Sequence, residues 1–482
     1  MLRDIEFRSR AAKGGAAAVH NAAMTPRRTV LIVTSSYAPA MIADMHRARL
    51  LAWELPALGW DVEILAPDIS YQLSNCVDQD GDAFFCPGTP VHFAPPLGGT
   101  MRRLIRSSTI GWRALLPLDA LAGKLFRQRK YDLVYFSTTQ FNLFALGARW
   151  RARYGIPYVL DIHDAIYQAA PPFFGGTPPG LKRSINLWLL KNVEASAARA
   201  ASALVSVSGK YLEDLQARAA SGNPEGQAPV RHAVIPFGAS ERDLAEAKSG
   251  MTAVGRRPDG VKRIVYVGAG GTIMARAFGE LCRTLRELVA GGGMAKRRVR
   301  IELYGTMSTW REGDRKDLSR IAADAGVSEF VFEDSRRVSY RKSLELLLGA
   351  DGALILGVDE EAYMPSKLYS YALSGKPLLG VFRQPSAVHR AFTRGSELGH
   401  LISYGKAGTS SEVGVSALER FLDEVFAGVN IDRKNAIAEH LAPAMASRHA
   451  DLFDACVAGL RPALDESGIL VGGTRSRKKS RA

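Results

Sequence analysis

A group of polar and charged residues stands at the start of a predicted helix in the second half of the chain. The stretch Asp359–Pro377 has the sequence DEEAYMPSKLYSYALSGKP, and Pro365 suits the first turn of a helix, because a helix interior excludes proline. The unbonded N–H groups at such a helix start, with Lys367 close to them, form a site for an anion. Gly375 before Pro377 is typical of a helix end that leads into a strand. A capped helix without a ligand is the alternative interpretation.

A glycine-rich loop follows an apolar run earlier in the same half. Its sequence, GAGGT over residues 268–272, precedes a helical pattern that contains Arg276. Gly270 and Gly271 would let backbone N–H groups approach a phosphate, and Arg276 could pair with a diphosphate. The spacing is not the GxGxxG of dinucleotide-binding loops, so a plain tight turn with a solvated arginine explains it equally well.

A histidine in the first half is the third candidate. His163 lies in the turn Asp161–Asp164, sequence DIHD, directly after a predicted strand. Its imidazole could hydrogen-bond a substrate hydroxyl, or it could be a structural histidine held by its neighbour Asp164. No Asp-x-Asp pair is placed to hold magnesium, and the four cysteines show no CxxC spacing, so we expect no metal site and reduced thiols (Cys76, Cys86, Cys282, Cys456).

The elements that must position these residues alternate between strands and helices. Thr29–Thr34 is a β-branched apolar run typical of a strand buried on both faces, a helical pattern covers about 41–58, and Asp61–Ala66 is a second strand. The later predicted strands are 132–136, 157–161, 203–207, 232–235, 263–268, 299–304, 329–333, 353–356 and 377–381, with helices at 141–154 and 185–201 among the connections.

This rhythm predicts an α/β fold with two successive doubly wound, Rossmann-like domains. In open parallel sheets ligands bind beyond the carboxyl ends of the strands, so two facing sheets would enclose a deep interdomain cleft. We expect a disordered basic extension (1–28), a first domain that binds the acceptor (29–238) and a second domain that binds the donor (239–440). A C-terminal helix that crosses back (441–463) and a basic tail (464–482) should follow.

The sequence resembles the retaining GT-B glycosyltransferases, the group often called family four or glycosyl transferases group 1. The stretch from Met364 to Pro377 is similar to the donor-site helix of that family, and Arg337–Tyr340 before a leucine-rich helix is similar to its approach to the donor site. Val234–Gly238, the turn at His163 and the turn that ends at Pro39 match other parts of the pattern. The matches spread in the expected order over residues 29 to 440.

The resemblance implies a role for each matching residue. His163 and Glu361 are the predicted catalytic residues, one on each side of the cleft. Helix N–H groups at Met364–Lys367 would stabilise a leaving diphosphate without a metal or other cofactor, and the reaction would retain anomeric configuration. The predicted donor-binding residues are Gly270, Gly271, Arg276, Tyr340, Tyr363, Met364, Pro365, Ser366, Lys367 and Ser370.

The chain departs from the family pattern at two positions. The family commonly has two glutamates eight residues apart, near the donor sugar and the ribose, and here Ala362 and Ser370 occupy those positions. Asp359, Glu360 or Glu361 could substitute for the first glutamate. Ser370 could still make one hydrogen bond to the ribose.

Composition narrows the class of protein. The chain has 482 residues, 47% hydrophobic and 23% charged, which fits a globular protein of two or three domains. No apolar run approaches the roughly 20 residues of a membrane-spanning helix, and the first 28 residues lack the apolar core of a secretory signal, so we expect a cytoplasmic protein.

The net charge of +15 suits a polyanionic partner. Residues 101–130 hold eight Arg and Lys, one Asp and several large apolar side chains, a composition that fits the surface of an anionic membrane. Phe173, Phe174, Lys182, Arg183 and Trp188 could extend this surface. A core helix with a basic outer face is the alternative, and Pro117 predicts two short helices there. No nucleic-acid-binding module is recognisable.

The sequence therefore predicts transfer of a sugar from a nucleotide-sugar donor to a saccharide or lipid-linked acceptor. By family resemblance, the expected setting is bacterial surface polysaccharide or lipopolysaccharide synthesis, with peripheral attachment to the inner face of the cell membrane. A non-catalytic nucleotide-sugar-binding protein and a GT-B nucleotide-sugar epimerase are the alternatives.

Overall fold

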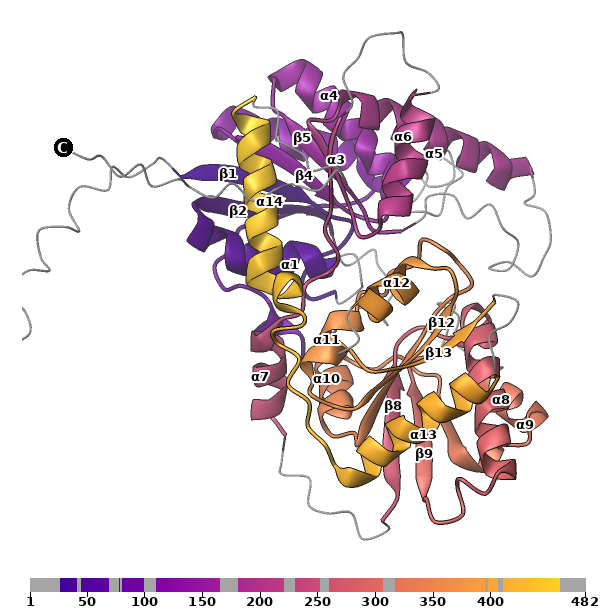
Figure 1. Ribbon diagram of the computed structural model, residues 1–482. Coiled ribbons are helices and arrows are strands. Elements are labelled where there is room, and N and C mark those ends of the chain that lie inside the picture. Colours follow the sequence, from indigo (N-terminus) through magenta and orange to yellow (C-terminus); the bar gives the residue numbers. More distant parts are fainter. Residues whose placement is uncertain are drawn as a thin grey trace, which may run out of the picture.

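The computed structural model describes residues 27–40, 45–68, 78, 80–98, 110–164, 181–220, 230–251, 260–306, 317–394, 398–405 and 411–459. Within them the chain forms two α/β domains, one above the other in Figure 1. Of the four cysteines, Cys86, Cys282 and Cys456 are free thiols, and Cys76 lies outside the described residues.

The first domain is built on a parallel sheet of seven strands in the order β3-β2-β1-β4-β5-β6-β7. The chain order reverses between β1 and β4, which pair with Val30 opposite Leu133. The strands are β1 Arg28–Val33, β2 Trp60–Pro67, β3 Val91–Ala94, β4 Leu133–Ser137, β5 Tyr158–Ile162, β6 Ala203–Ser206 and β7 Arg231–Val234.

The second domain repeats the plan with six parallel strands in the order β10-β9-β8-β11-β12-β13. Its reversal lies between β8 and β11, where Gly352 pairs with Ile264. The strands are β8 Lys262–Val267, β9 Val299–Tyr304, β10 Val331–Asp334, β11 Gly352–Leu356, β12 Leu378–Arg383 and β13 His400–Tyr404.

Helices cover both faces of each sheet (Figure 1). Those of the first half are α1 Met45–Glu54, α3 Ile110–Gln128, α4 Phe144–Tyr154, α5 Leu181–Ala200 and α6 Gly209–Ala220. Those of the second half are α7 Glu241–Ser249, α8 Ala275–Ala290, α9 Asp317–Asp324, α10 Tyr340–Leu348, α11 Leu368–Leu373, α12 Ala387–Arg394, α13 Ser411–Ala427 and α14 Ala442–Val457. Short 3₁₀ turns are η1 Leu55–Leu58, η4 Asp82–Phe84, η5 Phe141–Leu143, η7 Gly271–Ile273, η8 Ser328–Phe330 and η9 Ala438–His440.

The last helix, α14, returns to the first domain and lies beside α1 (Figure 1). The crossing is fixed where the backbone of Ala239 bonds to both His440 and Ala442, each at 2.8 Å. Phe453 of α14 is fully buried in the same core as Trp60, their rings 5.5 Å apart. The C-terminal helix is therefore part of the first domain's core.

Strand β1 shows why these strands are continuously apolar. Val30 and Ile32 enter the core on one face of the sheet, and Leu31 and Val33 enter the core on the other. Successive side chains of a strand point to opposite faces, so a strand covered on both sides must be apolar at every position. This is the physical basis of the predicted doubly wound fold, which the structure confirms.

Two strands and one helix differ from the prediction. Strands β3 and β13 were not predicted: each is a short edge strand with a histidine and only partly buried side chains at several positions. Pro117 does not divide α3, which is one helix of 19 residues. Proline has no N–H for the carbonyl of Arg113, one turn earlier, and that carbonyl instead accepts from the N–H of Leu97 at 3.0 Å. The helix therefore continues because a loop residue satisfies the freed acceptor.

Candidate functional site

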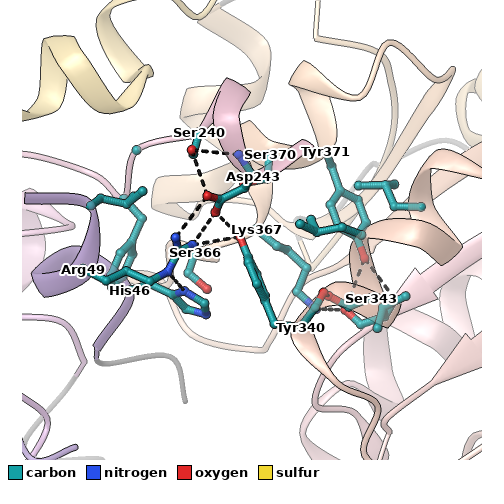
Figure 2. Close-up of a pocket in the computed structure, with 16 residues that line it drawn as sticks. His46, Arg49, Ser240, Asp243, Tyr340, Ser343, Ser366, Lys367, Ser370 and Tyr371 are labelled. Atoms are coloured by element: carbon teal, nitrogen blue, oxygen red, sulfur yellow. Dashed lines mark hydrogen bonds and ion pairs between the residues drawn. The ribbon is translucent and has the colours of Figure 1, made fainter. Parts of the chain in front are cut away.

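A pocket of about 100 Å³ lies between the two domains (Figure 2). Helix α1 forms its wall in the first domain, and the end of β8 with α10 and α11 forms the wall in the second. Its lining combines hydroxyl groups, a histidine, an arginine paired with an aspartate, one lysine and several apolar side chains: His46, Arg49, Leu50, Phe237, Gly238, Ser240, Asp243, Val267, Tyr340, Ser343, Leu344, Leu347, Ser366, Lys367, Ser370 and Tyr371. Four of the predicted donor-binding residues are among these: Tyr340, Ser366, Lys367 and Ser370.

Two cations line this pocket, Lys367 and Arg49, and Arg49 is paired with Asp243. Nζ of Lys367 donates to the carbonyl oxygen of Val267 at 2.8 Å and lies 4.1 Å from the ring centre of Tyr266. Burial lowers the pKa of Lys367 to about 7, because neither of these contacts brings a compensating negative charge. Gly268 has a φ of +137°, and a Cβ at that position would collide with Nζ. The first glycine of the loop therefore makes room for the lysine.

The segment around Lys367 is a turn rather than the helix start expected from Pro365. Helix α11 begins only at Leu368, with Lys367 at its N-cap, and it is six residues long. Pro365 lies three residues before the helix, and its carbonyl accepts from the N–H of Leu368 at 3.2 Å. Met364 packs against the cores of both domains. The predicted anion site at N–H groups 364–367 therefore belongs to a turn, and the short helix contributes little dipole.

The two other glycines of the loop have packing reasons for their type. A Cβ on Gly270 would lie 2.9 Å from Cβ of Thr306, and the N–H of Gly270 donates to the carbonyl of Thr306 at 3.2 Å. Gly271 has a φ of +64° at the start of η7. The N–H of Gly270 is thus engaged by the protein, and neither glycine lines the pocket.

Arg276 lies outside the pocket lining, on the first turn of α8. Its Nη1 is 2.7 Å from Oδ2 of Asp359, and Nε of Arg383 is 3.1 Å from the other oxygen of the same carboxylate. Asp359, one of the three acids considered as a substitute glutamate, is thereby held by two arginines.

The neighbouring acids point in different directions. Oε1 of Glu360 accepts a hydrogen bond of 3.0 Å from the hydroxyl of Tyr211 on α6, across the domain boundary. Burial and the nearby Asp164 raise the pKa of Glu360 above its ordinary value. Glu361 is half exposed and 3.8 Å from Arg390. Of the two, Glu360 makes the hydrogen bond to the first domain, and the charge pattern of the sequence could not separate them.

Ala362 and Tyr363 are part of the packing around this segment. Ala362 is 5% exposed and belongs to the apolar cluster that contains Phe237 of the first domain. Tyr363 packs against both cores of the second domain, and burial raises the pKa of its hydroxyl. A glutamate at position 362 would have no polar surroundings here, so this arrangement suits the alanine that the chain has.

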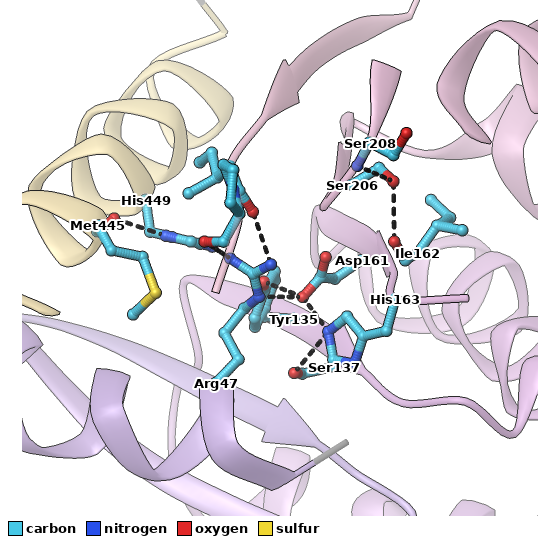
Figure 3. A network of polar contacts seen from close by, with 12 residues as sticks. Arg47, Tyr135, Ser137, Asp161, Ile162, His163, Ser206, Ser208, Met445 and His449 are labelled. Atoms are coloured by element: carbon cyan, nitrogen blue, oxygen red, sulfur yellow. Dashed lines mark hydrogen bonds and ion pairs between the residues drawn. The ribbon is translucent and has the colours of Figure 1, made fainter. Parts of the chain in front are cut away.

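His163 is held from inside the first domain (Figure 3). Its Nε2 contacts Oδ2 of Asp161 and lies 3.3 Å from Oγ of Ser137, so the partner is Asp161 and not Asp164. Its buried Nδ1 has no hydrogen-bond partner among the residues that the structure describes. The ring lies 5.0 Å from that of Phe237, which lines the pocket. His163 therefore stands behind the pocket wall with one nitrogen anchored and one unused.

Arg47 anchors the carboxylate that holds His163. Its Nε is 2.8 Å from Oδ2 of Asp161, and both side chains are fully buried. Although burial opposes ionisation, the charge of Arg47 and the hydrogen bond from His163 hold the pKa of Asp161 well below its usual range. Tyr135 donates to the same oxygen at 2.7 Å and lies 3.0 Å from Nε2 of His449 on α14. The imidazole at position 163 is thus fixed by a network that reaches the C-terminal helix.

A second buried network, at the pocket itself, escaped the sequence analysis. Arg49 on α1 contacts both oxygens of Asp243 on α7, and its Nη2 is 3.0 Å from the hydroxyl of Tyr340 on α10 (Figure 2). That hydroxyl donates to Asp243 at 2.7 Å. Tyr340, predicted to bind the donor, lines the pocket with its hydroxyl already engaged in this interdomain network. No local sequence signal connects Arg49 to a partner 194 residues away.

Comparisons with known proteins agree with this geometry. The family model of the glycosyl transferase 4-like domain matches residues 46–238, which lie in the first half of the chain. No curated protein matches the sequence.

Among solved structures, sucrose-phosphate synthase from Thermosynechococcus elongatus has a TM-score of 0.58 and 14% identity, over 90% of this chain and 100% of that one. HepE from Anabaena, in complex with UDP-glucose, has a TM-score of 0.55 and 15% identity, over 89% and 99%. The UDP-forming trehalose-phosphate synthase from Burkholderia xenovorans has a TM-score of 0.54 and 14% identity, over 91% and 100%.

Two parallel-sheet domains that face one another across a pocket define a GT-B fold, and these structures share it. The matched domain and the fold together support a GT-B glycosyltransferase.

The structure contains no helix long and apolar enough to cross a membrane among the residues it describes. Over the same residues, no group of three or more His, Cys, Asp or Glu side chains is placed to hold a metal ion.

Proposed function

We propose that this protein transfers a sugar from a nucleoside-diphosphate-sugar donor to a saccharide or lipid-linked acceptor, with retention of anomeric configuration. The observation that carries the proposal is Lys367, whose amine lies in the interdomain pocket against a carbonyl and an aromatic ring. A buried amine without a carboxylate partner costs free energy, and a diphosphate would supply the missing charge. Functional sites are where such costs are tolerated.

In this proposal the donor's diphosphate binds beside Lys367, and the hydroxyls of Ser366 and Ser370 on the same wall bond to its polar groups. The bond between the sugar C1 and the diphosphate oxygen breaks, and the leaving diphosphate takes the electron pair. The acceptor hydroxyl forms a new bond to C1 and gives its proton to the leaving diphosphate. Charge develops on the leaving group and on the sugar, so the ammonium group contributes where the transition state needs it. The proposal requires no metal or other cofactor.

The residues on the first-domain side would bind the transferred sugar. His163 has Nε2 held by Asp161, so the lone pair of the unpartnered Nδ1 can accept a hydrogen bond from a sugar hydroxyl in the neutral tautomer. Glu360 and Glu361, on the facing loop, are the candidate carboxylates. The proposed setting is bacterial polysaccharide or lipopolysaccharide synthesis in the cytoplasm, with peripheral attachment to the inner face of the membrane.

The direct test is a panel of nucleotide-sugars, beginning with UDP-glucose, which is bound in the HepE structure. Slow release of free nucleotide and sugar, without an acceptor, is the expected sign of a transferase. Lys367→Ala should reduce nucleotide affinity and the release rate by roughly ten-fold or more, because a charge-assisted contact contributes about 1.5–3 kcal/mol. Unchanged affinity in that variant would remove Lys367 from the site.

A non-catalytic binding protein is the second candidate function, and the buried apolar setting of Ala362 favours it. Such a protein would bind a nucleotide-sugar with measurable affinity, yet leave it intact over prolonged incubation. Calorimetric affinity with no detectable release of nucleotide, for every member of the panel, would decide for the binder.

A further inference from the structure

Four large apolar side chains are exposed along one face of the first half of α5. Leu181, Ile185, Trp188 and Leu189 are 80%, 51%, 63% and 39% exposed, and we call them the α5 stripe. Positions i, i+4, i+7 and i+8 lie on a single side of a helix. The other large apolar side chains that are exposed in the described part of the chain are scattered singly over both domains: Leu58, Phe93, Leu116, Val289, Val413 and Val429.

The α5 stripe lies on the half of the helix that projects from the domain. The second half is embedded: Ala197 and Ala198 are buried in the first domain's core, and the helix packs between α4 and α6. Figure 1 shows the first half extending past α6. An isolated helix end gains nothing by displaying tryptophan and leucine to water, because exposed apolar area is unfavourable. The exposure therefore indicates a surface that binds something.

Charge identifies the kind of partner. Residues 165–193 contain no Asp or Glu, and the part of α5 that carries the stripe contributes Lys182, Arg183 and Lys191. The N-terminal end of α3 adjoins the same region, since Nε1 of Trp112 donates to Oδ1 of Asn186 at 2.8 Å. Residues 83–118, which include that end, also lack acids. Apolar side chains with a tryptophan, on a helical segment whose charged residues are all basic, fit a bilayer interface with anionic headgroups.

The composition of residues 101–130 predicted that the membrane surface lies on α3 instead. Residues 101–109, like Phe173 and Phe174, lie outside the described residues, as do the side chains of Lys182 and Arg183. In α3, Leu118 and Leu125 are buried in the core, and Lys124 and Arg127 face outward. Helix α3 is thus a core helix with a basic outer face, and Leu116 is its one strongly exposed apolar side chain.

We propose that the α5 stripe is the surface by which this protein docks on an anionic lipid bilayer. The apolar side chains enter the interface, and the basic residues of the same half of α5 attract the anionic headgroups. This docking specifies the membrane attachment of the proposed function but does not need the transfer reaction, because it requires neither donor nor acceptor. The two proposals can therefore fail separately.

The test is co-sedimentation of the full chain with vesicles of phosphatidylcholine mixed with phosphatidylglycerol, compared with phosphatidylcholine alone. The protein should pellet with the mixed vesicles at low salt and much less at about 1 M salt, where the Debye length is about 3 Å. The double variant Ile185→Ser/Trp188→Ser should bind roughly ten-fold or more weakly, since it removes two large apolar side chains. The control Val289→Ser/Val413→Ser, exposed on the second domain, should pellet like wild type.

Several outcomes would overturn the proposal. They are equal pelleting of the stripe variant and wild type, equal binding to neutral vesicles, and loss of all binding when only the residues beyond Thr474 are deleted. Sedimentation without vesicles tests another occupant: a wild-type dimer that the stripe variant converts to a monomer would assign the α5 stripe to a second copy of the chain. A Trp188→Phe variant that shows the same fluorescence change on vesicle binding as wild type would show that Trp188 does not enter the interface.

Discussion

At the scale of single residues, Lys367 and His163 share one condition. Each is buried with part of its hydrogen-bonding or charge capacity unused: Lys367 faces a carbonyl and a ring, and Nδ1 of His163 has no partner. A buried polar group without a partner typically costs about 1–3 kcal/mol. Two such groups on either side of Phe237, which lines the pocket and touches the imidazole ring, are more economically explained by a ligand than by packing.

The pH dependence of nucleotide binding should follow Lys367. Its pKa of about 7 means that the amine is protonated in the free protein below that pH and neutral above it. A diphosphate favours the protonated form, so binding above about pH 7 must take up a proton, and affinity should fall by up to about ten-fold per pH unit. Calorimetry of UDP binding between about pH 7 and pH 9 measures this. A Lys367→Met variant should bind more weakly with a flatter profile; an equally steep profile in the variant would assign the titration to another group.

Removal of the imidazole should affect turnover far more than nucleotide affinity. His163 is separated from Lys367 by the wall at Phe237, so it would meet the sugar and not the nucleotide. His163→Ala should lower kcat by roughly 100-fold or more and change UDP affinity by no more than about two-fold, as expected for a contact made mainly in the transition state. Ser137→Ala, which removes the weaker neighbour at 3.3 Å, is the matched control. A parallel loss of UDP affinity would place His163 in the wrong part of the cleft.

The two adjacent glutamates give a sharper comparison. Glu360 accepts from Tyr211 and has a raised pKa, whereas Glu361 is half exposed beside Arg390. If Glu360 binds sugar hydroxyls as a carboxylate, activity should decline as pH falls through its raised pKa, and Glu360→Gln should lose about ten-fold in kcat/KM together with that acid limb. Glu361→Gln should keep the wild-type kcat/KM and the acid limb of the pH profile. The reverse pattern would return the catalytic role to Glu361, the residue that the sequence favoured.

At the scale of elements, the sequence predicts those strands and helices whose own residues carry the apolar pattern. Strands such as β1 and β11 were predictable because both faces of each sheet are covered and the apolar run is continuous. The edge strand β3 is partly exposed and carries no such run. The helix expected at Pro365 begins at Leu368, after a segment in which Met364 packs against both domains. Pro117 lies inside α3 because the N–H of Leu97, a residue outside the helix, bonds to the carbonyl that the proline leaves free. The two buried arginine networks join residues more than 100 positions apart, and nothing in the local pattern specifies such pairs.

The loop between β11 and α11 determines which substitutions the site tolerates. Ala362 lies in an apolar cluster with Phe237, whereas Ser370 lines the pocket. Ala362→Glu should therefore lower the free energy of unfolding by about 2 kcal/mol or more, because it buries a carboxylate with no partner. Ser370→Glu should be tolerated within about 0.5 kcal/mol. Urea unfolding of both variants checks this, and equal stability of the two would show that the loop opens to accept a side chain at 362.

At the scale of the whole molecule, the two domains are joined by more than the connecting chain. Helix α14 belongs to the second half of the sequence but completes the first domain's core, where His449 meets Tyr135. Between the domains, Arg49 of α1 is bonded to Asp243 of α7 and Tyr340 of α10. The pocket lies against this second network. The relative position of the domains, and with it the shape of the pocket, thus depends on buried charges.

Removing one of these charges should expose that dependence. Arg49→Ala leaves Asp243 buried without its cation, which should lower the free energy of unfolding by about 3–5 kcal/mol near neutral pH. In wild type, burial opposes ionisation of Asp243, but Arg49 holds its pKa below the usual value, so the pair stabilises above about pH 4 and the stabilisation is lost as pH falls. In the variant the unpaired carboxylate should have a raised pKa, so the folded state gains from protonation and the variant becomes more stable as pH falls from about 7. The deficit measured by urea unfolding should therefore narrow on acidification.

Arg28→Ala is the control, because it breaks an exposed pair with Asp454 and should cost less than about 1 kcal/mol. A deficit for Arg49→Ala that stays constant with pH would mean that lost packing, and not the buried charge, connects the domains.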